Sequence, residues 1–480
     1  MDVEVVSMSK TYRAYNPDQQ FLMPPSLREW LPENHLAYFV SDTIGEMDLS
    51  AIESVYENSL RGNPPYNPEM MVKLLFYSYC TGVVSSRKIA IKLVEDVAFR
   101  VLAAGNTPDF RTISDFRMLH LRALKGLFTQ VLLLCEKAGM AKLGHVALDG
   151  TKLKADASKH KAMSYGRMKE ESARLEFEIV KLLESAECAD NDEDQALGKD
   201  VRGDELPQEL AFRAGRLTKI RQAMAELEAE AKAEVPEIAV AESVETADKP
   251  ASKKSKKPKN QPTGIPDNKA QKNFTDPESK IMRSADKSFI QGYNAQTAVD
   301  SEYQIIVATM VTNNSADLPH TEAIVDKIEE IFGRLPDEMS LDAGYYSEAN
   351  VNFLESKNID AYVPPCRLKH REYRDAVAQP INDGSSIKDR MKAKVLTDEG
   401  RKKYGLRKET AEPVFGQIKE CRGFRQFSMR GVEKCDGEWS FVCAAHNLLK
   451  LFKHGAKAKL KQAQECIKST NTTQYQACEA

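Results

Sequence analysis

The order of the apolar stretches after residue 144 constrains the fold of this chain more than any other feature. Short runs rich in Val, Ile, Leu and Tyr alternate with amphipathic stretches, and this alternation indicates an α/β fold. The order also predicts a mixed sheet flanked by helices. The predicted strands are residues 145–148, 288–299, 303–311, 339–341 and 360–363, and helices are predicted over 319–332, 347–357, 410–421 and 438–452.

A long charged segment interrupts this pattern after the first predicted strand. Residues 165–235 favour helix and predict a helical hairpin or a short coiled coil. Residues 236–266 have low complexity and contain a basic run from Lys253 to Lys259, so they predict a disordered linker. Without this insertion, the strand order matches the RNase H-like architecture, in which the first and fourth strands are neighbours.

The first 140 residues predict an all-helical domain. Asn67-Pro68 is typical of a capped helix start, and residues 115–135 predict one longer helix. Two interpretations of this domain stay open, a helix-turn-helix-like DNA module and a helical bundle with solvated basic residues. The basic residues concerned are Lys88, Lys92, Arg100, Arg111 and Arg117.

These patterns predict a division of the chain into five parts. Residues 1–140 form the N-terminal helical domain with possible DNA binding, and residues 141–160 and 286–455 form the α/β domain. The remaining parts are a charged helical insertion (161–235), a flexible basic linker (236–285) and a disordered tail (456–480).

Composition limits the class of protein and the compartment. With 480 residues, of which 42% are hydrophobic, the chain can build two or three domains with real cores. No run approaches the roughly 20 apolar residues of a membrane span, and the first 16 residues lack a signal-peptide core, so we expect a cytoplasmic protein. Nine cysteines without a Cys-x-x-Cys pair predict reduced thiols.

The overall charge neither excludes nor supports binding to nucleic acid. The net charge is −3, but residues 161–250 hold 13 Lys/Arg and 22 Asp/Glu. The rest of the chain therefore carries a positive balance. Binding to phosphates depends on local basic surface, and residues 401–430, with Arg422 and Arg425 among them, are strongly basic. This segment suits a track for a DNA backbone.

Three acidic residues lie at the ends of predicted elements. Asp149 and Asp342 each follow a predicted strand, and Glu412 opens a predicted helix because Pro413 suits a first helical turn. If the first and fourth strands are neighbours, Asp149 and Asp342 lie close together. Three converging carboxylates can hold two Mg²⁺ ions, or Mn²⁺ in their place, and such a pair catalyses phosphodiester cleavage and strand transfer.

Each acid also has a purely structural explanation. Asp149-Gly150 is a common turn dipeptide, the same holds for Asp342 before Ala343-Gly344, and a Glu in a first helical turn is favoured by the helix dipole. Asp-Gly-Thr after a strand also occurs in haloacid-dehalogenase-type phosphatases. There a nucleophilic Asp lies two residues before the second Asp, and here that position is Ala147. Only the joint placement of the three acids favours a metal site.

Several segments of this chain resemble DDE transposases of bacterial insertion sequences, in the branch with a Tyr-Arg-Glu-Lys signature and an RNase H-like core. The resemblance spans most of the chain. It is carried by Pro108-Asp-Phe-Arg-Thr-Ile-Ser-Asp-Phe-Arg117, Leu148-Asp-Gly-Thr-Lys152, Thr275-Asp-Pro-Glu-Ser279, Gln291-Gly-Tyr-Asn-Ala-Gln-Thr-Ala-Val-Asp300, Asp342-Ala-Gly-Tyr-Tyr346 and Glu412-Pro-Val-Phe-Gly-Gln-Ile-Lys419.

The resemblance implies a role for each of these site residues. Asp149, Asp342 and Glu412 would be the catalytic, metal-binding triad. Tyr404, Arg407 and Lys419 would complete the signature and contact the DNA backbone near the cut. The signature places three residues between its Arg and Glu, but four separate Arg407 from Glu412, so the phosphate contact falls to Arg407 or Lys408.

The resemblance also implies the reaction and the partners. The expected enzyme hydrolyses DNA at the terminal inverted repeats of a transposon, and the freed 3′-hydroxyl then attacks target DNA. Joining two ends suggests a homodimer in the active complex. The alternative is a catalytically inactive DNA-binding protein derived from a transposase.

Overall fold

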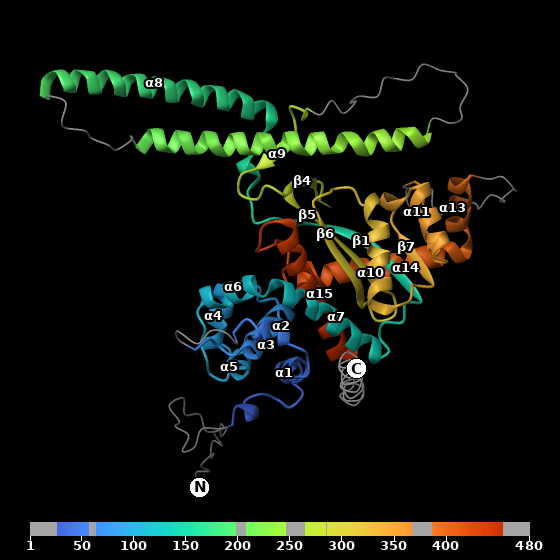
Figure 1. Cartoon of the computed structure of the whole chain (residues 1–480). Helices are drawn as coiled ribbons and strands as arrows, with labels where there is room; N and C mark the ends of the chain where they lie inside the picture. Colours follow the sequence, from blue (N-terminus) through green and yellow to red (C-terminus); the bar gives the residue numbers. More distant parts are fainter. Residues whose placement is uncertain are drawn as a thin grey trace, which may run out of the picture.

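The computed structural model describes residues 26–56, 64–197, 208–245, 265–284, 286–366 and 386–454. A mixed six-stranded sheet lies at the centre of these residues (Figure 1). Its strand order is β4-β5-β1-β7-β8, and β6 pairs with β5 beside β4. The strands are β1 (His145–Lys154), β4 (Lys280–Arg283), β5 (Phe289–Asp300), β6 (Ile306–Thr312), β7 (Glu338–Leu341) and β8 (Asp360–Tyr362).

Strand β1 has a partner on each side. It runs antiparallel to β5 and parallel to β7, where Leu148 pairs with Leu341. The predicted pairing of the first and fourth strands is therefore confirmed. The predicted end of β1 at Leu148 is wrong, because β5 continues to pair with β1 as far as Lys154. Asp149 accordingly lies inside a strand, opposite Thr297, and not in a turn.

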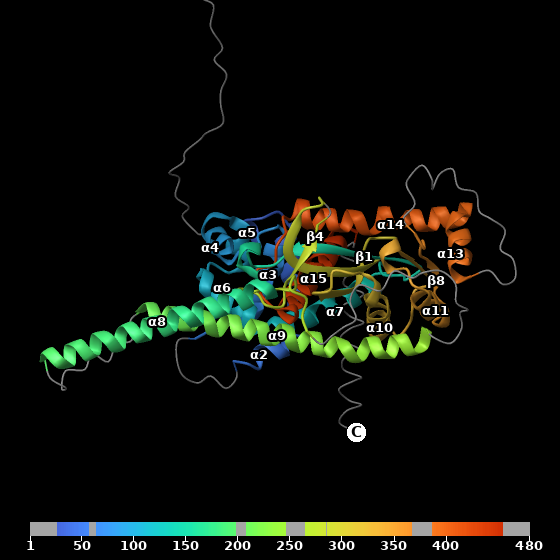
Figure 2. The same ribbon diagram turned by 90° about the horizontal axis from the view of Figure 1, so that it is seen from above.

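Helices cover both faces of the sheet. Figure 2 shows α14 (Asp398–Gly416) on one side of the sheet and α10 (Thr321–Phe332) and α11 (Glu348–Ser356) on the other. Helix α15 (Val432–His454) packs on β6, and Trp439 and His446 are buried there as core residues. The predicted helices α10 and α11 are confirmed, and Ser347 caps α11 by accepting a hydrogen bond from the Asn350 amide at 2.9 Å.

Polar residues begin helices in a stretch without an apolar pattern. No helix or strand is predicted between residues 363 and 410, but the structure has helix α13 (Ile387–Leu396) and the first turns of α14 there. Ser386 caps α13 and Thr397 caps α14, each by accepting a bond from a backbone amide three residues on. Capping of this kind satisfies amides that a helix start leaves unpaired.

Pro413 lies inside α14, so the predicted helix start at residues 410–412 is wrong. A proline inside a helix leaves the carbonyl four residues earlier without its amide partner. Here the Glu409 carbonyl instead accepts a hydrogen bond from the Gln304 side chain at 2.9 Å. Glu412 consequently lies near the end of a long helix, which continues into a π-helical turn, η5 (Gln417–Cys421).

The N-terminal helices share one hydrophobic core with the sheet domain. Helix α15 contacts both α3 and α7, and the rings of Phe76 and Phe441 lie 4.5 Å apart between centroids. The predicted single helix over 115–135 is wrong, because α6 and α7 meet at an angle of 73°. The predicted cap at Asn67 is confirmed, since its side chain accepts a bond from the Met70 amide. The helices are α1 (Leu36–Gly45), α2 (Ser50–Glu53), α3 (Pro68–Cys80), α4 (Ser86–Glu95), α5 (Val97–Leu102), α6 (Phe110–Leu119) and α7 (Leu121–Lys137), after the 3-10 turn η1 (Leu27–Glu29).

The charged insertion forms the predicted hairpin of two long helices, which lie side by side above the sheet in Figure 1. These helices are α8 (Tyr165–Leu197) and α9 (Gln208–Glu245), and Met168, Leu175 and Ile220 belong to a small core between them. The remaining short elements are the strands β2 (Ala162–Ser164) and β3 (Gln271–Asn273) and the turns η2 (Lys159–Lys161), η3 (Leu318–His320) and η4 (Ala343–Tyr345).

The predicted linker over 236–285 is wrong at both of its ends. Helix α9 continues through Pro236 to Glu245, and the later part supplies β3, which pairs with β2, and β4, which joins the main sheet. The basic run from Lys253 to Lys259 lies outside the described residues, as does the predicted tail 456–480.

Two further expectations concern membranes and cysteines. Within the described ranges, no single helix has the length and apolar character of a membrane span; only α6 and α7 reach it together, and their apolar side chains are largely buried in the core. The six cysteines whose side chains the structure describes are free thiols, and four of them are buried.

Arg117, one of the basic residues considered for DNA contact, is instead part of the core. It is buried and donates hydrogen bonds to the Tyr79 hydroxyl at 2.9 Å and to the Val84 carbonyl at 3.1 Å. The Tyr79 hydroxyl in turn donates to Glu438 on α15 at 3.3 Å. Arg117 therefore connects α6 to α15, whereas Arg100 and Arg111 are exposed.

We predict that Arg117→Ala lowers the free energy of unfolding by about 2 kcal/mol or more, because it leaves buried polar partners unsatisfied. Arg111→Ala, on the same helix, should change it by less than about 0.5 kcal/mol. Urea unfolding followed by tryptophan fluorescence measures both. Equal midpoints for the two variants would contradict a structural role for Arg117.

Candidate active site

The three predicted acids lie around one guanidinium group. The Asp149 carboxylate on β1 is 2.8 Å from Arg407 Nη1. Arg407 Nη2 lies 3.8 Å from Asp342 Oδ1 and 3.9 Å from Glu412 Oε1. The structure thus brings together side chains from β1, from the end of β7 and from α14, although 193 positions separate the two aspartates.

The local backbone explains how each acid reaches this place. Asp149 projects from the middle of β1, while Asp342 follows β7 and begins the turn η4. Arg407 and Glu412 are five residues apart on α14, which crosses β1 and β7. Exposure increases across the group, from 10% for the Arg407 side chain and 18% for Asp149 to 40% for Asp342 and 56% for Glu412.

Burial changes the acidity of Asp149. Loss of solvent raises the pKa of Asp149 to about 6, although Arg407 and the Gly150 amide favour the charged form. Asp342 and Asp317 add repulsion that raises this pKa further. A buried carboxylate whose pKa lies near neutral pH is a frequent property of catalytic and binding sites.

Arg407 is a buried cation with an incomplete set of partners. Burial alone would lower the pKa of its guanidinium, but Asp149, Tyr404, Asp342 and Glu412 raise it. Its Nε atom is buried without a hydrogen-bond partner. Tyr404 lies beside it, with the guanidinium 5.7 Å from the ring centroid and the hydroxyl 3.5 Å from Asp342.

Lys419 lies against the next part of β1. Its ammonium group donates hydrogen bonds to the Thr151 hydroxyl and, at 3.1 Å, to the Lys152 carbonyl. Burial lowers its pKa, with Asp149 among the nearby charges that act in the opposite direction. Lys419 is thus held close to the acids, although it lies in the π-helical turn that follows α14.

The other basic residues predicted to bind DNA differ in their exposure. Lys408 and Arg425 are exposed, and Arg425 forms an ion pair with Glu420. Arg422 is buried, and its guanidinium is hydrogen bonded to His446 at 3.0 Å and to the Gln417 carbonyl at 3.2 Å. The prediction of a DNA contact for Arg422 is therefore corrected, because its charge faces the protein interior.

Sequence reasoning missed a fourth acid beside the site. Asp317 lies just before η3, and its Oδ1 accepts hydrogen bonds from Asn294 at 2.7 Å, Gln296 at 2.8 Å and Lys152 at 2.9 Å. Burial acts to raise the pKa of Asp317, but these bonds and the Lys152 charge hold it below its usual value. No motif marked Asp317, because its partners come from strands distant in sequence.

The donor set around Arg407 fits a hard divalent cation. It consists of carboxylate oxygens, the ligands that Mg²⁺ prefers, and it already surrounds a positive charge. In the parts of the chain that the structure describes, no three His, Cys, Asp or Glu side chains are close enough to hold a metal as they stand. A metal ion held between Asp149, Asp342 and Glu412 would take the place of the Arg407 guanidinium, which now lies 2.8 to 3.9 Å from these carboxylates.

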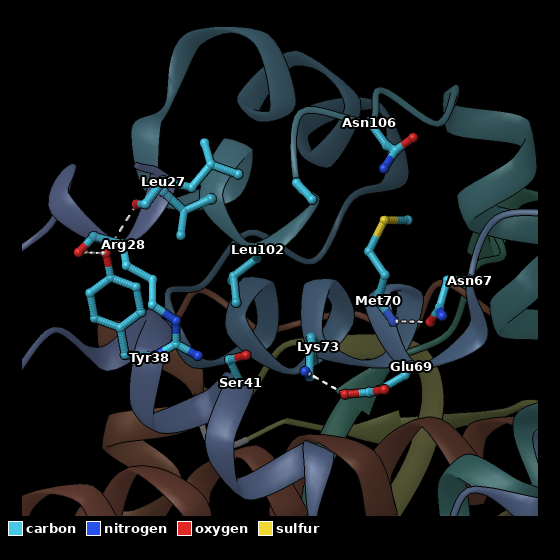
Figure 3. A pocket seen from close by; sticks show the side chains of 12 residues that line it. Leu27, Arg28, Tyr38, Ser41, Asn67, Glu69, Met70, Lys73, Leu102 and Asn106 are labelled. Atoms are coloured by element: carbon cyan, nitrogen blue, oxygen red, sulfur yellow. Dashed lines mark hydrogen bonds and ion pairs between the residues drawn. The ribbon is translucent and has the colours of Figure 1, made fainter. Parts of the chain in front are cut away.

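A separate hollow of about 430 Å³ lies among the N-terminal helices. Figure 3 shows Lys73 paired with Glu69 on its wall, with Arg28, Tyr38 and Asn67 around it. None of its lining residues belongs to the group around Arg407. We assign this hollow no role in the site.

Comparison with known proteins gave two family matches. Residues 25–119 match the family described as Transposase domain (DUF772), and residues 364–452 match the family described as Transposase DDE domain. The second match includes Arg407, Glu412 and Lys419, while Asp149 and Asp342 lie outside both. No curated protein and no solved structure matched the chain.

We predict that Asp149→Asn makes the metal-free protein more stable than wild type above pH 6, with no difference near pH 3.5. Between these values the unfolded Asp149 loses its proton while the folded one keeps it, so wild type loses about 1–3 kcal/mol as pH rises. Thermal unfolding of both proteins in EDTA across this pH range measures the difference. Parallel curves would show that burial does not raise the pKa of Asp149.

Proposed function

We propose that this chain, which both family matches support as a DDE transposase of the insertion-sequence type, cleaves DNA at transposon ends and joins the freed 3′-hydroxyl to target DNA. The observation that carries this proposal is the meeting of Asp149, Asp342 and Glu412 at one buried cation. Phosphodiester chemistry needs a site that concentrates opposite charge around a phosphate and its metal ions.

We assign the sheet domain to the RNase H-like architecture. The support is its strand order, in which an antiparallel β6-β5-β1 unit is followed by β7 and β8, both parallel to β1. The helical insertion enters between β1 and β5. We assign residues 1–140 to a separate helical domain. It is joined to the sheet domain by the packing of α7 against α15 in the shared core.

Each acid would serve as a metal ligand. Two Mg²⁺ ions, or Mn²⁺ in their place, would supply an activated oxygen nucleophile and stabilise the leaving oxygen. Asp149 is the most buried of the three acids and lies on the central strand, so it is the best placed to remain fixed while the others adjust. Its raised pKa means that metal binding would release a proton as the pH falls toward 6.

The signature residues would orient the DNA backbone. Lys419 holds a positive charge beside β1, close to Asp149, where it can face a phosphate next to the cut. Arg407, once withdrawn from the acids, has a planar guanidinium suited to bidentate phosphate contact. The Tyr404 ring lies beside the Arg407 guanidinium, and its hydroxyl lies 3.5 Å from Asp342. Tyr404 would therefore hold these two side chains at a fixed separation.

Two exposed surfaces would carry the rest of the DNA. Lys408 and Arg425 lie outside the acidic group on the C-terminal helices. In the N-terminal helices, Arg87 and Arg111 stack on the half-exposed Phe110 ring, at 5.2 and 5.8 Å from its centroid. Basic side chains around an exposed aromatic ring suit contact with a nucleic acid. The acidic hairpin α8–α9 would stay away from phosphates.

We predict that Asp149→Ala, Asp342→Ala and Glu412→Ala each reduce Mg²⁺-dependent nicking of a terminal inverted repeat by about 10²-fold or more. The matched control is Glu409→Ala, an exposed glutamate three residues before Glu412 on the same helix. It should retain activity. DNA binding in EDTA should persist in all four variants, since phosphate contacts do not require the metal.

The same assay distinguishes the alternative function. Wild type that binds the inverted repeat but never nicks it with Mg²⁺ or Mn²⁺ would indicate an inactive DNA-binding protein derived from a transposase. Nicking that survives all three alanine substitutions would remove the triad assignment while leaving the family unchanged. A homodimer is expected when two ends are joined, and sizing of the protein–DNA complex measures it.

We predict that Lys408→Ala weakens DNA binding about equally on all sequences and reduces the slope of log Kd against log salt by about 1. Arg422→Ala should instead lower thermal stability, because it empties a buried position next to His446. Fluorescence anisotropy in a salt series and thermal unfolding separate the two effects. An unchanged salt slope in Lys408→Ala would remove Lys408 from the DNA track.

A further inference from the structure

We propose that Asp317 is a positioning residue that fixes Asp149 and Asp342 at the spacing that metal binding requires. It does so from the opposite face of the sheet, together with Lys152, Asn294 and Gln296. This inference rests on the proposed function, because it concerns the same metal site. Asp317 lies outside both family matches and is not one of the three acids around Arg407.

Asp317 joins the two long strands behind the site. Its Oδ1 accepts three hydrogen bonds, from Lys152 on β1 and from Asn294 and Gln296 on β5. Lys152 also pairs with it as a largely buried cation, 14% exposed. The loop before α10 is therefore fastened to β1 within three residues of Asp149. Since its Oδ1 is fully engaged and its charge is compensated by Lys152, Asp317 is suited to holding structure rather than to binding a metal.

Gly150 shows how closely this group approaches β1. Successive residues of a strand face opposite sides of the sheet, so the position after Asp149 faces away from Arg407. A Cβ atom added at Gly150 would lie 2.9 Å from Asp317 Oδ1 and 3.1 Å from Asn294 Oδ1. The atom nearest to this Cβ is the Gln296 amide nitrogen, and together with Asp317 Oδ1 it leaves no room for a side chain unless these groups move. The glycine leaves the space that the hydrogen-bonded group occupies.

The same group reaches the turn that carries Asp342. A Cβ added at Gly344 would lie 3.5 Å from Asp317 Oδ2, so the turn lies beside this carboxylate. Tyr345, the next residue, is buried and donates a hydrogen bond to Gln296, which is itself bound to Asp317. Asp149 is therefore one residue, and Asp342 two residues, from a glycine that lies against the Asp317 group.

Residues behind metal ligands commonly control metal affinity. Substituting such partners typically weakens binding about 10–100-fold even when the ligands remain. Loss of Asp317 would leave Lys152 without its counter-charge and let the Asp342 turn shift relative to β1. We therefore expect the loss of Asp317 to weaken metal binding. The loss of affinity should exceed what a lower stability of the fold alone would cause.

The test is Mg²⁺ titration of thermal unfolding in the full chain without DNA. Wild type should be stabilised by Mg²⁺, and Asp149→Ala should abolish this shift. We expect Asp317→Asn to raise the Mg²⁺ concentration for half-maximal stabilisation by about 10-fold or more. The matched control is Asp300→Asn, a buried aspartate at the far end of β5 that also accepts three hydrogen bonds, from the amides of Lys142, Leu143 and Glu302. It should lower the melting temperature and leave the half-maximal concentration unchanged.

Gly150→Ala provides a second test that leaves Asp317 in place. The added methyl group would push away the hydrogen-bonded ends of the Gln296 and Asp317 side chains, so it should reproduce the weaker Mg²⁺ response. An unchanged half-maximal concentration in both Asp317→Asn and Gly150→Ala, with a normal wild-type response, would overturn this inference and leave the proposed function intact. Absence of any Mg²⁺ stabilisation in wild type would overturn both.

Discussion

The pairing of β1 with β5 on one side and β7 on the other is the constraint on which the rest of the structure depends. It places a buried aspartate in the middle of the sheet and a second aspartate at the end of the next strand. Helix α14 then crosses this pair and adds Arg407 and Glu412. The parallel pairing of Leu148 with Leu341 is what brings the Asp149 and Asp342 carboxylates close together.

The same register explains why the two faces of β1 carry different chemistry. The Asp149 face holds Arg407 and Glu412 of α14 and is open to solvent near Glu412. The Gly150 face holds neutralised and hydrogen-bonded polar groups that link three elements. The two faces depend on each other, because exposed charges keep their positions only when the backbone behind them is held in place.

The sequence predicted the parts of this fold that depend on local periodicity. Strands β5, β6, β7 and β8, helices α10 and α11 and the long hairpin followed from apolar spacing, and the start of α3 followed from its cap, Asn67. The meeting of Asp149 and Asp342 was inferred from strand order. The predictions failed where a contact with a residue distant in the sequence determines the local secondary structure. Strand β1 continues past Asp149 because β5 pairs with it, and Pro413 is tolerated because Gln304 binds the freed carbonyl.

The site was predictable to a similar degree. Residue types and motif spacing indicated the three acids, but they could not show that Arg422 is buried or that Asp317 lies behind β1. Burial of a single charge depends on packing between α15 and the π-helical turn, which leaves no pattern in a short stretch of sequence. Contacts between separate strands and loops are likewise invisible until the topology is known.

The guanidinium between the acids has a consequence for ion selectivity. Any ion that enters must replace a charge of +1 that is already bound to Asp149 at 2.8 Å. A monovalent ion such as Na⁺ or K⁺ would exchange one unit charge for another and gain little, whereas a divalent ion brings an additional charge to three carboxylates. An internal cation of this kind would make the site selective for a small divalent ion over the abundant monovalent ions of its surroundings.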